Sequence, residues 1–343
     1  MINFINKKKY LKKQLKRQPD NVNLLNELAI TLIELNNYEQ AYKCLKKAYD
    51  LKKGVKQLNN LAYFYYAECK PTLVDGEYEW EDANKEAIEL LKEAIAQNPN
   101  SHFPYDLLGE ILLYAEKDDK AADYILKAIE IKPTMNNLNN MGVYYYQKSN
   151  FREAAEYFRK ATEYSINSLT PLLNYGICLA ELNHKEEALQ VGEELLELNE
   201  ELGDVSYQEI SFIYYIIKEY QKFEEAFTKD DIMFLCVEWY PPYLYGLYQL
   251  GKLDEMNQFV EGVIQKKERE MQDSMQDEDQ DWEEGQLEEY LEEEKKEIAF
   301  LKAEKDKVLE GICPGVDYEA SYEKDCYLFG CMRHENPKSD YRF

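Results

Sequence analysis

Histidine is scarce in this sequence, with three residues among 343. Because histidine is the side chain that changes charge most readily near neutral pH, little is left for acid–base catalysis. The sequence also lacks the serine–histidine elbow, the glycine-rich phosphate loop and the zinc-protease helix that mark common enzyme classes. We therefore expect a protein that is not an enzyme. A catalyst built from carboxylates alone stays an open alternative, because a catalytic pair could not be told from the many Asp and Glu residues.

Long hydrophobic runs are absent as well. No stretch of about 18 apolar residues occurs, which excludes a membrane-spanning helix of the usual kind. The short apolar start Met1–Ile5 is followed directly by Lys7, Lys8 and Lys9, so the apolar core of a secretory signal is missing. We expect a cytoplasmic protein that has no membrane partner.

Positive charge is in deficit, because 41 Lys and Arg residues stand against 67 Asp and Glu residues, a formal net charge of −26. Nucleic acids and anionic membranes are negative surfaces that would repel such a chain, so neither is an expected partner. A basic protein would be easier to bind. The hydrophobic content of 45% is ordinary for a folded protein and argues against global disorder.

What the sequence does contain is an internal repeat. The segment Leu58–Tyr66 returns as Leu138–Tyr146, and both begin with Leu-Asn-Asn. A second phrase places Ala121, Ala154 and Ala188 at intervals of 33 and 34 residues. A period of this length built from two amphipathic helices is typical of an α-solenoid, in which repeats stack in a row.

Within each unit, small residues fall where paired helices would cross, and large apolar residues surround them. Only Gly or Ala lets two helix backbones approach closely at such a crossing. The pattern is clearest in three units: Leu25, Leu28, Ala29, Leu32, Tyr38, Ala41, Leu45 and Ala48; Tyr105, Leu108, Gly109, Leu112, Ala121, Ile125, Ala128 and Pro133; Leu138, Met141, Gly142, Tyr145, Phe151, Ala154, Phe158 and Ala161. This pattern resembles the tetratricopeptide repeat family. The resemblance implies an all-α fold, a right-handed α-solenoid of tetratricopeptide-like helix pairs with capping helices.

The chain then divides into five segments. They are a basic N-terminal capping helix at 1–20, five repeats at 21–202 with an insertion near 70–83, two degenerate helical repeats at 203–267, an acidic linker and C-terminal capping helix at 268–310, and a Cys/His-containing tail at 311–343. Within the acidic segment we expect a mobile linker at 270–282 and a helix at 283–310. The insertion is either a tolerated surface loop or an aromatic, acidic finger that contacts a partner.

The tail holds three of the seven cysteines and one of the three histidines. Cys313, Cys326, Cys331 and His334 could supply the three thiolates and one imidazole of a closed tetrahedral zinc site. Such a site would leave no position for a substrate, so a zinc ion here would be structural. The alternative is a cysteine-bearing tail without metal.

In tetratricopeptide stacks the first helix of each unit faces a concave groove, so the resemblance implies that the groove is the binding site. The matching positions are rich in Asn and Tyr and include two acids: Asn26, Asn59, Asn60, Tyr63, Tyr66, Asp106, Glu110, Asn139, Asn140, Tyr146 and Asn174. An amide side chain both donates and accepts, so a row of Asn residues can grip an extended peptide whatever its sequence. The alternative is that these amides cap or bridge neighbouring helices.

These observations predict a non-catalytic protein- or peptide-binding scaffold or adaptor that uses a concave Asn/Tyr-rich groove. Two alternatives stay open. The acidity also suits an immunity- or antitoxin-type inhibitor of a basic toxin partner. The cysteine-rich tail also suits a metal-dependent enzyme with the repeats as a targeting arm.

Overall fold

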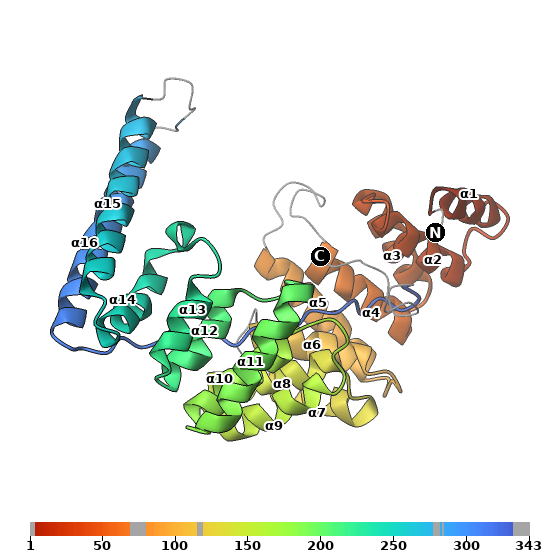
Figure 1. The fold of residues 1–343 in the computed structure, drawn as a ribbon. Helices are drawn as coiled ribbons and strands as arrows, with labels where there is room; N and C mark the ends of the chain where they lie inside the picture. The colour runs from red at the N-terminus through yellow and green to blue at the C-terminus, as the bar shows by residue number, and fades with distance from the viewer. Residues whose placement is uncertain (1–3, 69–79, 115–118, 277–281, 283–284, 332–343) are drawn as a thin grey trace. The chain divides into compact units, whose positions relative to one another are not determined.

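A computed structural model describes residues 4–68, 80–114, 119–276, 282 and 285–331 (Figure 1). Every regular element in these residues is a helix, so the predicted all-α solenoid class is confirmed. The insertion loop and His334 lie outside the described residues. The helix that follows the insertion begins at Trp80, inside the range 70–83 that was predicted for the insertion.

The helices follow one another as first and second members of consecutive pairs, preceded by α1 and followed by α16. Their bounds are α1 Phe4–Leu15, α2 Val22–Ile33, α3 Tyr38–Leu51, α4 Val55–Tyr63, the π-helical turn η1 Phe64–Glu68, α5 Trp80–Ile95, α6 Phe103–Tyr114, α7 Ala121–Ile131, α8 Met135–Gln147, α9 Phe151–Thr162, α10 Thr170–Glu181, α11 Lys185–Leu202, α12 Tyr207–Ile216, α13 Tyr220–Phe227, the 3₁₀ turns η3 Ile232–Phe234 and η4 Val237–Trp239, α14 Tyr240–Gln249, α15 Leu253–Gln276 and α16 Gln286–Leu309.

The chain forms two compact units. Unit 1 comprises Met1–Tyr145 and Tyr322–Phe343, and unit 2 comprises Tyr146–Ser321. The division falls near the end of α8. After α16 the chain has no further helix among its described residues, and we call Gly311–Cys331 the C-terminal segment. Each unit therefore contains a set of repeats and one stretch of this segment.

Glycine permits the close helix crossings that the sequence predicted. A Cβ atom on Gly109 of α6 would lie 2.6 Å from Cγ1 of Ile125 on α7. A Cβ atom on Gly176 of α10 would lie 2.9 Å from Cγ1 of Val191 on the paired helix α11, and 2.6 Å from Cδ1 of Ile213 on α12, the first helix of the next pair. These distances are shorter than van der Waals contact, so a larger residue at either position would push the helices apart.

The turn after the first helix of a pair has the same geometry in several repeats, with one residue at positive φ: Asn36, Ser149, Asn183, Lys218 and Gly251. After α10, the N–H of His184 donates to the carbonyl of Leu179 at 2.9 Å, and after α12 the N–H of Glu219 donates to Tyr214 at 2.8 Å. This closure is a common way to satisfy the last carbonyls of a helix. The two degenerate repeats thus keep the turn of the clear ones.

The acidic region is more helical than the sequence predicted. The expected linker at 270–282 is wrong for residues 270–276, because α15 continues to Gln276. Met271 is buried, and Lys267 on α15 lies 2.9 Å from a carboxylate oxygen of Glu294 on α16, so α15 is held against α16 beyond residue 268. The following helix begins at Gln286 rather than at residue 283. Among the described helices, none has the length and apolarity that a bilayer crossing requires.

Candidate functional site

In unit 1, amide side chains on the first helices of the repeats bind the main chain of the C-terminal segment, which is drawn in blue in Figure 1. Asn59 Nδ2 donates to the carbonyl of Tyr327 at 2.7 Å. Asn26 and Asn60 both donate to the carbonyl of Phe329, at 3.1 Å each. Asn60 Oδ1 in turn accepts from the N–H of Phe329 at 2.7 Å. One amide side chain thus satisfies both main-chain groups of one residue.

The same two-bond pairing occurs on α8 and, in unit 2, on α10. Asn140 Nδ2 donates to the carbonyl of Glu323 and its Oδ1 accepts from the N–H of the same residue, both at 3.1 Å. Asn174 pairs in this way with Ser321, at 2.7 and 3.1 Å. Because only main-chain groups are used, this contact would fit any extended peptide. We call these paired Asn residues the amide ladder.

The repeat period explains the ladder. Asn26 and Asn60 are 34 residues apart, and Asp106, Asn140 and Asn174 follow one another at the same interval. A helical repeat of fixed length brings the same position of each successive repeat to the same face of the stack. The predicted alternative, an amide bridging two helices, also occurs here, because Asn60 Nδ2 of α4 lies 2.8 Å from Asn26 Oδ1 of α2.

Tyr327 places its side chain inside the groove of unit 1. Its hydroxyl donates to Oε2 of Glu110 at 2.9 Å. Its ring lies edge-on to Tyr63 and Phe103, with ring centroids 6.4 and 6.0 Å away. The side chain is 2% exposed, and burial raises the pKa of Tyr327 well above its usual value. The hydroxyl therefore keeps its proton and acts as a donor.

Glu110 on α6 is the buried acid that receives this hydroxyl. Burial raises the pKa of Glu110 to about 8, although hydrogen bonds from Tyr327 and Tyr66 and the charge of Lys324 act in the opposite direction. At pH 7 the carboxyl is therefore mainly neutral, which avoids burying a charge. Tyr66 lies in the π-helical turn η1, an irregularity that often marks a functional position in a helix.

Asp106 and Asn139 complete the predicted groove residues of unit 1. Asp106 Oδ2 lies 2.5 Å from Nδ1 of His102, a buried residue for which the sequence offered no site role. Burial raises the pKa of Asp106, and the hydrogen bond from His102 acts against that increase. Asn139 is fully buried on α8.

In unit 2 the stretch Gly311–Ser321 meets tyrosines as well as the amide ladder. Tyr146 donates to the carbonyl of Tyr318 at 3.2 Å, and the Tyr318 hydroxyl donates to Asn174 Oδ1 at 2.7 Å. Tyr215, which the sequence did not single out, donates to the carbonyl of Pro314 at 2.8 Å. Asn174 was predicted because it follows the repeat period. Tyr215 was not, because a contact with chain that has no regular structure gives no periodic signal in the sequence.

The predicted zinc ligands are distributed over both units. Cys313 is exposed in unit 2, with its sulfur 3.5 Å from the Tyr215 hydroxyl. Cys326 and Cys331 are buried in unit 1, and His334 lies outside the described residues. Within the described ranges, no group of three or more potential ligands converges. The zinc site stays a prediction.

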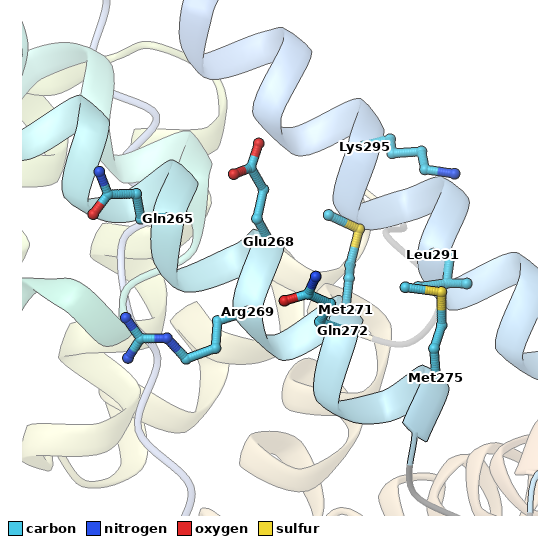
Figure 2. A pocket seen from close by; sticks show the side chains of 8 residues that line it. All are labelled: Gln265, Glu268, Arg269, Met271, Gln272, Met275, Leu291 and Lys295. Atoms are coloured by element: carbon cyan, nitrogen blue, oxygen red, sulfur yellow. The ribbon is translucent and has the colours of Figure 1, made fainter.

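A separate cleft of about 570 Å³ lies between α15 and α16 of unit 2 (Figure 2). Met271 and Met275 extend from α15 toward α16, where Leu291 adds a third apolar side chain (Figure 2). The remaining lining is polar or charged: Gln265, Glu268, Arg269, Gln272 and Lys295. The cleft contains none of the predicted site residues.

The tetratricopeptide repeat family model matches residues 22–54, 104–135 and 139–201. These ranges coincide with α2 and α3, with α6 and α7, and with α8 to α11. The chain is a tetratricopeptide-repeat protein. This match agrees with the resemblance that the repeat phrases indicated. Asn26, Asp106, Asn140 and Asn174 lie inside the matched ranges, on first helices of the pairs.

Relatives of this tetratricopeptide-repeat protein share parts of the chain. It is 28% identical over 153 residues to the anaphase-promoting complex subunit CDC16 of Saccharomyces cerevisiae, a match that covers 42% of this chain and 18% of that protein. The chain thus matches less than a fifth of that relative's length. The solved structure of PilF from Pseudomonas aeruginosa is 18% identical, covers 64% of this chain and 89% of its own, and has a TM-score of 0.50. YrrB, described as a tetratricopeptide-repeat protein with an unusual peptide-binding site, is 18% identical over 56% of this chain and 93% of its own, with a TM-score of 0.44.

Proposed function

We propose that this tetratricopeptide-repeat protein is a non-catalytic scaffold or adaptor that holds an extended protein segment in its Asn/Tyr groove. The amide ladder carries the proposal, because Asn60, Asn140 and Asn174 each pair with both main-chain groups of one residue. The chain's own C-terminal segment supports it by acting as an example of the peptide conformation that the ladder accepts. Side chains on such a peptide would then decide which partner binds.

The environment of the buried acids supports a binding role over catalysis. Shifted pKa values often mark catalytic groups, and Asp106 and Glu110 are the acids to consider. Each is nevertheless engaged by a neighbouring side chain, Asp106 by His102 and Glu110 by Tyr327. Both are at most 4% exposed, so neither can reach a dissolved substrate while the C-terminal segment is in place.

We further propose a cytoplasmic location and a basic partner segment, which the net charge of −26 supports. Opposite charges raise the rate of encounter more than they raise affinity. We also keep, on the sequence alone, a structural zinc bound by Cys313, Cys326, Cys331 and His334. Elemental analysis of protein purified without added metal should then give close to one zinc per chain, and this zinc should be lost in Cys326→Ser. A metal-free preparation would overturn the zinc proposal.

Cross-linking mass spectrometry on complexes of the full chain, captured from its native cell, tests the groove. Lys56 adjoins the groove, because its Nζ lies 3.5 Å from the position of a Cβ on Gly330. Lys46 on α3 and Lys127 on α7 are exposed on second helices of the pairs and are the matched controls. We expect partner cross-links at Lys56. Cross-links confined to Lys46 and Lys127 would contradict the proposal.

A further inference from the structure

We propose that the groove of unit 1 selects an extended partner segment with the order tyrosine, aliphatic residue, aromatic residue, and that this partner enters by displacing Tyr322–Cys331. This selectivity presupposes the peptide-binding groove proposed above, and it names the partner chemistry. Four features of the described residues support it. They are the ligand-like way in which the segment is held, the tyrosine contact, the aromatic contact and an imperfect fit.

The stretch Tyr322–Cys331 is held as a ligand would be. It contains no helix or strand, and its main chain is bound by side chains that lie far away in sequence, 303 residues away for Asn26 and Phe329. Among the described residues, no main-chain group of a helix in unit 1 bonds to the main chain of this stretch. Removal of the stretch would therefore expose the groove and leave the main-chain hydrogen bonds of the helices in place.

A tyrosine is selected because its hydroxyl donates a hydrogen bond to a buried acceptor. Glu110 is 2% exposed and receives the hydroxyl of Tyr327 at 2.9 Å. A phenylalanine in the same place would fill the ring space between Tyr63 and Phe103 but would leave this oxygen without that donor. An unsatisfied buried acceptor should lower affinity by about tenfold or more.

The two residues after this tyrosine extend the pattern. Leu328 is fully buried, which requires an apolar side chain. The ring of Phe329 lies 5.0 Å from that of Phe103, centroid to centroid. Asn60 binds both the N–H and the carbonyl of Phe329. The amide ladder therefore fixes the register of the peptide, and the contacts with Tyr63 and Phe103 select its side chains.

The resident segment does not satisfy every polar atom of the groove. The hydroxyl of Tyr114 is buried, and it has no hydrogen-bond partner among the residues that the structure describes. Its ring is covered by Tyr322, at a centroid distance of 3.5 Å. Since an unsatisfied buried hydroxyl is unfavourable, a partner that offers a polar atom here would bind better than the segment does.

Displacement is limited by tethering. A ligand joined to its own groove has an effective concentration that reaches the millimolar range for a short flexible connection. A free peptide at micromolar concentration would compete poorly with it. Weakening the resident segment, with the groove unchanged, should therefore raise the apparent affinity for an added peptide.

The test uses the full chain and a fluorescein-labelled synthetic peptide with the sequence Tyr322–Cys331, followed by fluorescence anisotropy under reducing conditions. We expect Tyr327→Ala in the chain to raise peptide affinity at least about tenfold over the unmodified chain. On that variant, a peptide carrying Tyr327→Phe should bind about tenfold less well than the unmodified peptide. Tyr164→Ala is the matched control, because Tyr164 is 48% exposed and lies in unit 2.

Equal affinity of the Tyr and Phe peptides would overturn the tyrosine preference, and no gain from Tyr327→Ala would overturn displacement. Where that variant fails to fold, hydrogen exchange of the unmodified chain decides. The amides of Glu323 and Phe329 should exchange faster than the helical amides of α6, and equal protection would overturn the proposal. Partner cross-links at Lys56 without peptide exchange would refute displacement and leave the scaffold function standing. Peptide exchange together with partner cross-links confined to other lysines would refute the groove as the partner's binding site and leave displacement of the segment standing.

Discussion

The two stretches of the C-terminal segment are buried to different degrees in their units. In unit 1, Tyr327, Leu328 and Cys331 are at most 2% exposed. In unit 2, Ile312 is 50% exposed, and the buried side chains of the stretch Gly311–Ser321 are Tyr318 and Ala320, at 8% each. Both stretches use the amide ladder for their main chain. The difference is therefore made by side chains and not by main-chain hydrogen bonds.

Composition accounts for this difference. The stretch in unit 2 includes Gly311 and Gly315, which have no side chain to bury, and its Ile312 is 50% exposed, whereas the stretch in unit 1 carries Tyr, Leu and Phe in succession. Burial of a large apolar side chain stabilises by roughly 1.5–3 kcal/mol. The stretch in unit 1 should thus carry most of the stability and most of the sequence preference, and the stretch in unit 2 should open first.

The largest expected effect is that of Tyr327→Ala on the stretch in unit 1. Loss of the buried ring, together with an acceptor left without its donor, should cost about 3–5 kcal/mol. Ile312→Ala in the exposed stretch should cost less than about 0.5 kcal/mol. Hydrogen exchange of the amides of Glu323 and Phe329 reports the local loss, and thermal melting reports any global one. Similar losses in both variants would remove the contrast between the stretches.

The pH dependence of the stretch in unit 1 should come next in size. The pKa of Glu110 is about 8 in the folded chain and 4.5 as its ordinary value. A raised pKa means that stabilisation is complete below about pH 4.5 and is lost as pH rises to about 8, with a slope of at most about 1.4 kcal/mol per pH unit. The groups that face this carboxyl include Tyr66, Tyr327, Lys324 and Asp325, and Tyr114 also interacts with its charge.

Glu110→Gln isolates this carboxyl, because an amide of the same shape still accepts from Tyr327 but does not titrate. Urea midpoints measured at pH 6, 7 and 8 should fall with rising pH in the unmodified chain, and the fall should be smaller in the variant. Asp106, whose pKa is also raised by burial, can leave a residual slope. An identical slope in both proteins would show that Glu110 does not titrate in this range.

The amide ladder should give a smaller and more symmetrical effect. Asn60→Ala in unit 1 and Asn174→Ala in unit 2 each remove two main-chain hydrogen bonds, at about 0.5–1.5 kcal/mol for each bond. The exchange protection of Phe329 and of Ser321 should therefore fall by similar amounts. Partner affinity should change by less than tenfold, because the partner and the resident segment lose the same contacts. A large loss of affinity with unchanged protection would mean that the partner alone uses the ladder.

Much of the groove could be predicted from the sequence, because its polar residues follow the period that built the solenoid. Asn60 and Asn140 occupy the same position in two duplicated phrases, so the sequence alone could place both on the groove side of their helices. The occupant was not predicted. Tyr327 and Phe329 lie in chain that has no helical or strand period, and the cysteines of that chain suggested a zinc site instead. A contact between residues more than 200 positions apart, such as Glu110 and Tyr327, leaves no local pattern.

The smallest expected effect on stability lies outside both stretches, in the acidic residues between α15 and α16. Asp277, Glu278, Asp279 and Asp281 lie outside the described residues. Their replacement by neutral amides should leave the melting temperature nearly unchanged, because so dense a run of carboxylates lies outside the repeat pattern, and surface charges contribute little to folding. At physiological salt, charges act over roughly 8 Å, so these residues should mainly tune the encounter with a basic partner. Stopped-flow association should become slower and less dependent on salt in the variant. An association rate that changes neither with salt nor with these substitutions would refute electrostatic steering. The groove of unit 1 alone would then account for recognition.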